Sequence, residues 1–330
     1  MKGGHIFPIG KMVRIMGSEF TGRTEKIAAE ASALGCIIEK NAVLKDRTTF
    51  RIGGKCDLLV ELNGEESFLK LIPLAEGLEI PYYIFGKGSN LIVDSEGISG
   101  VVFVSGKAFS GISLKGGSTL VCKAGTPLSQ ICNFALENSL GGLEFAYGIP
   151  GTLGGAVFMN AGAYGGEMKD VVSSVRAMDR KGNVREYSPE ELDLSYRHSR
   201  FSGSGEIILS AEIALQNGDR SEIKGKMDEL MEKRRSKQPL EFPSAGSTFK
   251  RPEGSYASLL IEQCGLKGVH VGDAEVSEKH SGFIINRGNA DFSQLMELIE
   301  IVRNTVREKT GYVLECEPLI ISDKNEYRTL

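Results

Sequence analysis

The densest glycine cluster of the chain is residues 141–166, GGLEFAYGIPGTLGGAVFMNAGAYGG. Glycine makes up 41 of the 330 residues, well above the usual share of about 7%. The chain has only 10 prolines, and its glycines follow no triplet repeat, which excludes a collagen-like fibre. Glycine clusters in an otherwise globular sequence indicate backbone that packs closely against a ligand. This segment therefore predicts a binding core built from the main chain.

Two shorter glycine loops precede this cluster. They are Ile52-Gly53-Gly54 and Gly86-Lys87-Gly88-Ser89-Asn90. Unpaired N–H groups in such loops can hydrogen-bond a pyrophosphate without side chains, although each loop alone is also compatible with a simple turn. The second loop is not a Rossmann fingerprint, because Leu91 occupies the third glycine position and a strand follows instead of a helix. A Walker-type phosphate loop is also missing from the sequence, so nothing points to ATP chemistry.

The overall composition is that of an ordinary globular protein. Hydrophobic residues make up 41%, charged residues 25%, and the formal net charge is -4, so no excess of positive charge points to nucleic acid. The six cysteines show no CxxC spacing and the four histidines are scattered, which predicts reduced thiols and no metal site. No apolar run approaches the roughly 20 residues that span a bilayer. Because Lys11 and Arg14 interrupt the mildly apolar N-terminus, we expect a cytoplasmic protein without a signal peptide.

Hydrophobic periodicity predicts a mixture of helices and strands. Helices are expected at residues 21–34, 65–76, 127–139, 221–237, 255–264 and 291–309. Strands are expected at residues 57–62, 82–85, 91–93, 101–104, 119–123, 207–215 and 313–321, with a hairpin formed by 171–178 and 184–187. The elements do not alternate regularly, as they would in a doubly wound sheet. A highly charged helix follows residues 217–219, which predicts a domain boundary near residue 218.

A series of motifs occurs in a fixed order between residues 41 and 321. The motifs are Thr49-Phe50-Arg51-Ile52-Gly53-Gly54, the loop 86–90, residues 142–156, Asn160-Ala161-Gly162-Ala163-Tyr164-Gly165, Ser195-Tyr196-Arg197-His198-Ser199, Gln238-Pro239-Leu240, residues 244–249 and Leu314-Glu315-Cys316-Glu317. Together they resemble the UDP-N-acetylenolpyruvoylglucosamine reductase family. The chain looks like the shorter branch of that family, which lacks an extra loop carrying a substrate-binding tyrosine.

The resemblance implies an α+β protein with a vanillyl-alcohol-oxidase-like (PCMH-type) FAD-binding domain of two α/β lobes and an α/β substrate-binding domain. The expected boundaries are an N-terminal extension and helix at 1–35, the FAD-binding domain at 36–218 with its lobes divided near residue 105, the substrate-binding domain at 219–322 and a C-terminal tail at 323–330. This division agrees with the boundary that composition predicts.

The resemblance also implies which residues bind FAD, without a covalent bond, and which bind the substrate. The implied FAD-binding residues are Arg51, Gly53, Gly86, Lys87, Gly88, Ser89, Asn90, Leu91, Gly125, Gly148, Ile149, Pro150, Gly151, Thr152, Gly154, Gly155, Ala156, Asn160, Gly162 and Ala163. The implied substrate-binding residues are Tyr164, Tyr196, Gln238, Phe249 and Lys250. Arg251 departs from the family pattern, which often has asparagine there, so contacts assigned to that asparagine are not carried over.

The implied reaction reduces the enolpyruvyl ether of UDP-N-acetylglucosamine to UDP-N-acetylmuramate, with NADPH as the reductant. Arg197 matches the family's catalytic arginine, Ser247 its proton donor and Glu317 its glutamate. A guanidinium can bind the substrate carboxylate through two hydrogen bonds, and a placed hydroxyl can supply a proton. From local sequence alone, Arg197 could equally be a surface arginine and Ser247 a turn serine. Spacing also fails to separate Glu317 from Glu315, because both would point to one face of a strand.

Two other readings of the chain stay open from the sequence. One is an FAD-linked oxidase or dehydrogenase of the same superfamily, which would share the glycine loops but would not need Ser247 and Glu317. The other is a nucleotide-binding regulator that kept the fold and lost catalysis. We expect a monomer whose partners are the enolpyruvyl nucleotide and NADPH, with no nucleic acid and no membrane.

Overall fold

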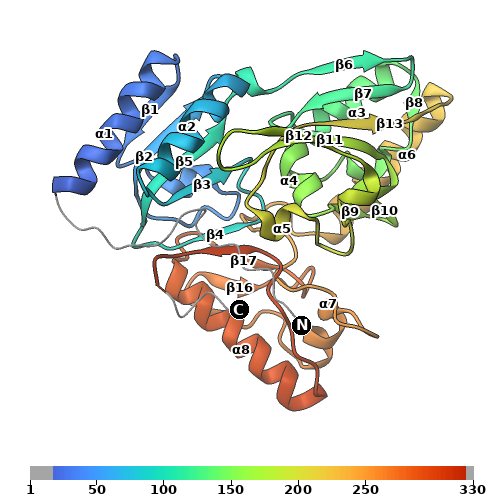
Figure 1. Cartoon of the computed structure of the whole chain (residues 1–330). Helices are drawn as coiled ribbons and strands as arrows, with labels where there is room; N and C mark the ends of the chain where they lie inside the picture. The colour runs from blue at the N-terminus through green and yellow to red at the C-terminus, as the bar shows by residue number, and fades with distance from the viewer. Residues whose placement is uncertain (1–17, 325–330) are drawn as a thin grey trace. The chain divides into compact units, whose positions relative to one another are not determined.

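The computed structural model describes residues 18–324, which form two compact units (Figure 1). Unit 1 contains residues 57–86, residues 100–232 and the described residues up to Asn41. Unit 2 contains residues 42–56, residues 87–99 and the described residues from Lys233 onward. The expected extension before residue 18 and most of the expected tail, after residue 324, lie outside the described residues.

The first sheet of unit 1 has the strand order β1-β2-β5-β3. Its strands are β1 (Ile37–Lys40), β2 (Cys56–Leu62), β3 (Tyr82–Phe85) and β5 (Ile98–Ser105). Strand β1 runs antiparallel to β2, whereas β3 runs parallel to β5. The helices of this part are α1 (Ser18–Ala33) and α2 (Glu65–Gly77). Helix α2 buries Phe68, Leu71 and Ile72, a spacing that gives a helix one apolar face.

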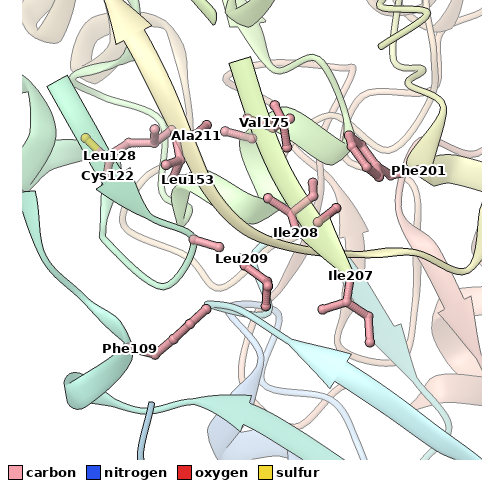
Figure 2. Packing of buried hydrophobic residues seen from close by; sticks show 14 of the residues in the cluster. Phe109, Cys122, Leu128, Leu153, Val175, Phe201, Ile207, Ile208, Leu209 and Ala211 are labelled. Atoms are coloured by element: carbon pink, nitrogen blue, oxygen red, sulfur yellow. The ribbon is translucent and has the colours of Figure 1, made fainter. Parts of the chain in front are cut away.

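The second sheet of unit 1 is antiparallel and has the order β12-β11-β13-β7-β6. Its strands are β6 (Ile112–Lys115), β7 (Thr119–Lys123), β11 (Val172–Met178), β12 (Val184–Tyr187) and β13 (Ile207–Ala214). The helices α3 (Leu128–Glu137) and α4 (Leu153–Phe158) contribute to the same core. Figure 2 shows part of that core, including Leu128 of α3, Leu153 of α4 and the paired residues Cys122 and Ala211.

Helix α8 (Phe292–Thr310) organises the core of unit 2. It begins at Asp291, whose carboxylate accepts a hydrogen bond from the Gln294 N–H at 2.9 Å, and it ends at Gly311 with φ 79°. Its buried side chains are Phe292, Leu295, Met296, Leu298, Ile299, Val302 and Val306. Each contributes about 1.5–3 kcal/mol on burial, so this face holds the helix in place.

The rest of unit 2 joins early and late parts of the chain. Strand β4 (Leu91–Val93) pairs in parallel with β18 (Leu319–Ile321), with Leu91 opposite Leu319. A small antiparallel sheet has the order β15-β16-β17. Its strands, and the helix beside them, are β15 (His270–Val271), β16 (Ala274–Val276), β17 (Ile284–Asn286) and α7 (Ala257–Gln263). The hydrophobic cluster of this unit contains Phe50 and Ile92 as well as the C-terminal residues.

Short elements complete the described chain. They are the pair β8 (Leu140–Gly141) and β14 (Gln216–Asn217), the pair β9 (Gly162–Ala163) and β10 (Gly166–Glu167), and the helices α5 (Phe201–Ser204) and α6 (Arg220–Lys237). Short 3-10 helices cover Leu44–Arg47, Lys107–Phe109, Glu144–Ala146, Met168–Asp170 and Pro189–Glu191.

The predicted helices and strands are confirmed with small shifts at their ends, except at one place. The strand expected at 313–321 is wrong in length, because only Leu319–Ile321 forms a strand. Residues before it alternate between exposed and buried, but they find a backbone partner only around the isolated bridge between Phe249 and Cys316. The structure also adds helix α4 inside the glycine-dense segment, where no helix was predicted.

Candidate active site

The glycine loops of unit 2 are packed backbone against backbone. Gly88 has φ 62°, and a Cβ at this position would lie 2.0 Å from the carbonyl oxygen of Arg47. A Cβ at Gly54 would lie 2.4 Å from the Gly97 nitrogen. The Thr49 N–H donates to the Gly88 carbonyl at 3.2 Å. Glycine is therefore required for these two loops to approach each other.

The glycine loops of unit 1 show the same close packing. A Cβ at Gly86 would lie 2.6 Å from the Thr152 hydroxyl oxygen, and one at Gly125 would lie 2.5 Å from the Phe109 carbonyl oxygen. A Cβ at Gly162 would lie 2.7 Å from the Gly166 carbonyl oxygen. The implied FAD-binding residues thus fall into two sets of tight loops, one in each unit.

One loop presents N–H groups in the way that a phosphate requires. Within residues 18–324, the N–H groups of Gly88, Ser89 and Asn90 make no hydrogen bond to the protein. Successive N–H groups of this kind bind anions. Since the glycines at this loop exclude side chains from the backbone, the residues present fit a cofactor with a pyrophosphate, such as FAD.

The segments that carry Ser247 and Glu317 are paired in unit 2. The Glu317 N–H donates to the Thr248 carbonyl at 3.0 Å, and the Lys250 N–H donates to the Glu315 carbonyl at 2.9 Å. These bonds flank the bridge between Phe249 and Cys316. Two stretches far apart in sequence therefore meet at adjacent backbone positions, and Ser247 directly precedes the residue that holds Glu317.

Burial separates the two glutamates that spacing alone could not separate. Glu315 is largely exposed and forms an ion pair with Lys250 at 3.4 Å. Glu317 is half-buried, and both its backbone N–H and its carbonyl form hydrogen bonds within unit 2. An exposed ion pair of this kind contributes little to stability. The half-buried Glu317 is thus the better candidate for work on a bound substrate.

The glycine loop at residues 86–90 and the segment that carries Glu317 are joined directly by hydrogen bonds. The Asn90 side-chain amide donates to the Glu317 carbonyl at 3.3 Å, and the Leu319 N–H donates to the Asn90 carbonyl at 2.9 Å. The Thr49 hydroxyl donates to the Ser244 carbonyl at 2.7 Å. Both glycine loops of unit 2 are therefore anchored to the segments that carry Ser247 and Glu317.

Arg197 lies at the tip of a tight turn in unit 1. Ser195 and His198 exchange two backbone hydrogen bonds of 3.1 Å each, and Arg197 has φ 54°. Its guanidinium carbon lies 5.0 Å from the centre of the Tyr196 ring, a distance at which a cation is attracted to the ring face. Tyr196 is 47% exposed, so the pair stands at the surface of its unit.

Left-handed backbone is concentrated among the implied site residues. Eight described residues other than glycine have clearly positive φ. Four of them are implied site residues, namely Arg51, Asn160, Tyr164 and Arg197. Each such conformation costs about 1–3 kcal/mol and persists only where the surroundings enforce it. This distribution is typical of a functional site.

The remaining implied substrate-binding residues have contrasting environments. The Gln238 side-chain oxygen is buried and has no hydrogen-bond partner among residues 18–324, which costs free energy until a donor reaches it. Tyr164 is 46% exposed. Phe249 is buried in the hydrophobic cluster of unit 2. Arg251 lies over the Tyr256 ring, with 4.8 Å between its guanidinium carbon and the ring centre.

Two buried residues close in sequence to the implied catalytic residues were not predicted individually from the sequence. Thr248 is 1% exposed, and its hydroxyl oxygen accepts from the Ile284 N–H at 3.0 Å. Ser199 is wholly buried and donates to the Phe158 carbonyl at 2.7 Å. Both lie inside motifs that were singled out for a neighbouring residue, and only the folded chain shows their side-chain hydrogen bonds.

Other kinds of site receive no support from the described residues. Between residues 18 and 324, no three histidine, cysteine, aspartate or glutamate side chains gather closely enough to hold a metal ion. Of the described helices, none is long and apolar enough to cross a membrane. The six cysteines are free thiols, and burial raises the pKa of Cys122 and of Cys316 to about 12.

Comparison with known families assigns the cofactor class. The profile of the FAD binding domain family matches residues 56–188, which cover most of the two sheets of unit 1. The profile of the C-terminal domain of UDP-N-acetylenolpyruvoylglucosamine reductase matches residues 238–321, which lie in unit 2. The chain is therefore a flavoprotein of the α+β class, with the FAD-binding fold that the sequence predicted.

Individual relatives narrow the class to one family. The chain is 49% identical to a UDP-N-acetylenolpyruvoylglucosamine reductase of Clostridium novyi over 88% of this chain and 94% of that protein. The corresponding values for the Clostridium tetani protein of the same name are 46%, 87% and 92%. The crystal structure of the Thermus caldophilus reductase superposes with a TM-score of 0.75 at 36% identity, over 87% of this chain and 100% of that one. The chain belongs to the UDP-N-acetylenolpyruvoylglucosamine reductase family.

Proposed function

We propose that this protein reduces the enolpyruvyl ether of UDP-N-acetylglucosamine to UDP-N-acetylmuramate, with NADPH as the reductant, in the synthesis of the peptidoglycan precursor. Membership of the reductase family supports the reaction. The observation that carries the assignment of residues is the pairing of the Thr248 and Glu317 segments, because it brings two of the three expected catalytic positions together in one unit.

The loops around Gly53, Gly88 and Gly151 would hold FAD through their backbone N–H groups. When bound, FAD would supply the hydride-transfer chemistry between NADPH and the terminal carbon of the enolpyruvyl double bond. Asn160 is set apart from the other proposed cofactor-binding residues, because its side chain is fully engaged within the protein.

Three side chains have distinct tasks in this proposal. Hydride addition to the terminal carbon leaves negative charge on the carbon that bears the carboxylate. Arg197 stabilises this charge by binding the carboxylate with two parallel hydrogen bonds. Ser247 donates its hydroxyl proton to the charged carbon, which completes the lactyl ether. Serine suffices as the acid because the acceptor is strongly basic, and a positioned acid contributes about 10²–10⁴-fold. Glu317 keeps Ser247 and the carboxylate oriented.

The wider setting follows from the same assignment. Tyr164, Tyr196, Gln238, Phe249 and Lys250 are proposed to contact the nucleotide sugar. The buried Gln238 side-chain oxygen, which has no hydrogen-bond partner among residues 18–324, is suited to an N–H donor of the ligand. We propose that the FAD-binding domain lies between boundaries near residues 36 and 218, and that the substrate-binding domain extends from there to a boundary near residue 322. We further propose that the protein works in the cytoplasm as a monomer, without nucleic acid or membrane partners.

The proposal is tested by separating the two half-reactions of Ser247→Ala under anaerobic conditions. We expect the variant to keep its yellow colour and to bleach normally with NADPH. Return of the colour on addition of the enolpyruvyl nucleotide should slow by at least about 10²-fold, because no acid protonates the carbon. The matched control is Ser258→Ala in α7, which should behave as the unaltered protein in both steps. Normal recovery of colour in Ser247→Ala would remove this serine from the mechanism.

A further inference from the structure

The turn that carries Arg197 is bound by the buried side-chain amide of Asn160. Asn160 is 0% exposed. Its side-chain nitrogen donates to the Ser195 carbonyl at 3.0 Å and to a Glu167 carboxylate oxygen at 2.6 Å. Its side-chain oxygen accepts from the Lys169 N–H at 2.8 Å. Both amide hydrogens are therefore used inside the protein, and the oxygen is already an acceptor.

A second anchor lies on the other side of the same turn. The Ser199 hydroxyl donates to the Phe158 carbonyl at 2.7 Å. Phe158 is the last residue of α4, two residues before Asn160. Residues 195–199 are thus fastened at both ends to one short stretch of the glycine-dense segment, and Arg197 lies between the two fastenings.

The Glu167 carboxylate makes the first anchor stronger than an ordinary amide contact. It forms an ion pair with the Lys169 side chain, and the Glu167 N–H donates to Asp170 at 2.9 Å. Hydrogen bonds to an ionised acceptor are roughly twice as strong as neutral ones. The amide plane of Asn160 is therefore fixed, and with it the direction of the bond to Ser195.

We infer that Asn160 is a positioning residue for Arg197, which acts by holding the turn 195–198 in the strained conformation that presents the guanidinium. The inference rests on the proposed function of Arg197. A residue with φ 54° is disfavoured and needs surroundings that enforce it. Asn160 supplies that restraint through Ser195, and its side chain has no hydrogen left to offer a cofactor.

The decisive variant is Asn160→Asp, which keeps the size and the acceptor but removes both donors. We expect FAD content and the rate of bleaching by NADPH to stay within about twofold. Reoxidation by the enolpyruvyl nucleotide should slow by about 10–100-fold at saturating substrate, because small displacements of a catalytic group have effects of this size. A variant that instead loses FAD or bleaches slowly would show that Asn160 serves the cofactor, and the inference would be wrong.

Exchange of the amide and the carboxylate between residues 160 and 167 distinguishes an effect on the position of Arg197 from a general effect on protein stability. In the double variant Asn160→Asp with Glu167→Gln, the glutamine amide can donate to the new carboxylate, so thermal stability should recover. No donor then faces the Ser195 carbonyl, so reoxidation should stay slow. Recovery of both thermal stability and reoxidation would contradict the inference that Asn160 acts through its hydrogen bond to the Ser195 carbonyl. The matched control is Tyr82→Phe, which removes a partly buried hydrogen bond of 2.9 Å to Glu76 in the same unit and should leave both half-reactions unchanged.

Two further variants keep the outcome clear. Arg197→Ala must slow reoxidation without affecting bleaching. If it does not, the proposed function of Arg197 has failed, whatever Asn160 does. If Arg197→Ala is slow but Asn160→Asp is normal, only the positioning inference has failed. Should Asn160→Asp not fold, Ser199→Ala removes the second anchor, and we expect the same selective loss at about threefold to tenfold. Unchanged reoxidation in that variant would also contradict the inference.

Discussion

At the scale of single residues, Gly88 determines whether the two loops of unit 2 can meet. Its φ of 62° and the 2.0 Å approach of a Cβ to the Arg47 carbonyl oxygen both oppose any side chain. Gly265 is a natural comparison, because it has φ 72° in the same unit but nothing within 4 Å of a Cβ. The two positions therefore separate backbone strain from collision.

We expect Gly88→Ala to lower the free energy of unfolding by more than the roughly 1–2 kcal/mol that left-handed backbone costs an alanine, and to reduce the FAD content after purification. Gly265→Ala should show only the strain and retain FAD. The measurements are chemical unfolding and the ratio of flavin to protein absorbance. Equal behaviour of the two variants would show that the loop adjusts freely around residue 88.

The same scale shows what the sequence could and could not predict about the site. The motifs predicted Ser247 and Glu317, and the structure places their segments side by side. The resemblance implied a cofactor contact for Asn160, and we infer a different task because its amide hydrogen bonds lie within the protein, which a motif cannot show. Thr248 and Ser199 were missed for the same reason, since a buried hydroxyl has no pattern of its own.

At the scale of elements, Asp291 shows how one residue starts α8. The hydrogen bond from the Gln294 N–H, assisted by the Ser293 hydroxyl, holds the pKa of the Asp291 carboxyl below its usual value. A lowered pKa in the folded state means that the ionised form stabilises the fold above the unfolded pKa of about 3.9. This contribution is lost as the pH falls through the folded pKa.

We expect Asp291→Ala to lower the free energy of unfolding by about 1 kcal/mol at pH 7. Asp291→Asn is the matched variant, because asparagine caps a helix about as well as aspartate but does not titrate. The Asp291→Asn variant should keep most of its free energy of unfolding at pH 7. As the pH falls below about 4, its free energy of unfolding should decrease less than that of the unaltered chain. Parallel pH dependence of the two proteins would contradict the assigned role of the charge.

Elements with a regular local pattern were predicted well even where their partners are distant, since the bounds of β4 were predicted although it pairs with β18. The bounds of β3 and β7 and the face of α8 follow from local periodicity. Helix α4 was missed because glycine is a poor helix former, and tertiary packing of Leu153 and Val157 overrides that tendency. The strand at 313–321 was drawn too long, because alternation of burial does not reveal where a backbone partner ends.

At the scale of the whole molecule, the two units have separate hydrophobic clusters. Cys122 and Cys132 belong to the cluster of unit 1, and Cys264 and Cys316 belong to that of unit 2. Burial raises the pKa of Cys122 and Cys316 to about 12, so almost no thiolate exists at pH 8 until the surrounding core opens. Each unit therefore carries its own reporter of unfolding.

We expect Ile299→Ala, a change at a wholly buried position of α8, to cost about 2–5 kcal/mol. When the urea concentration is raised, Cys264 and Cys316 of the Ile299→Ala variant should react with a thiol reagent at a lower concentration than Cys122 and Cys132. Ile213→Ala in β13, equally buried in unit 1, should reverse the order. Mass spectrometry of the labelled peptides gives the result. Simultaneous labelling of all four thiols in both variants would show that the units unfold as one.

The parallel pairing of β4 with β18 has a consequence for biosynthesis. Strand β4 leaves the ribosome long before its partner β18, because Leu91 pairs with Leu319. Until then the nascent chain carries an unpaired apolar strand, the kind of edge that promotes association between chains. Completion of unit 2 must therefore wait until β18 has been translated, and a chain that terminates before Leu319 is expected to keep β4 without its partner strand.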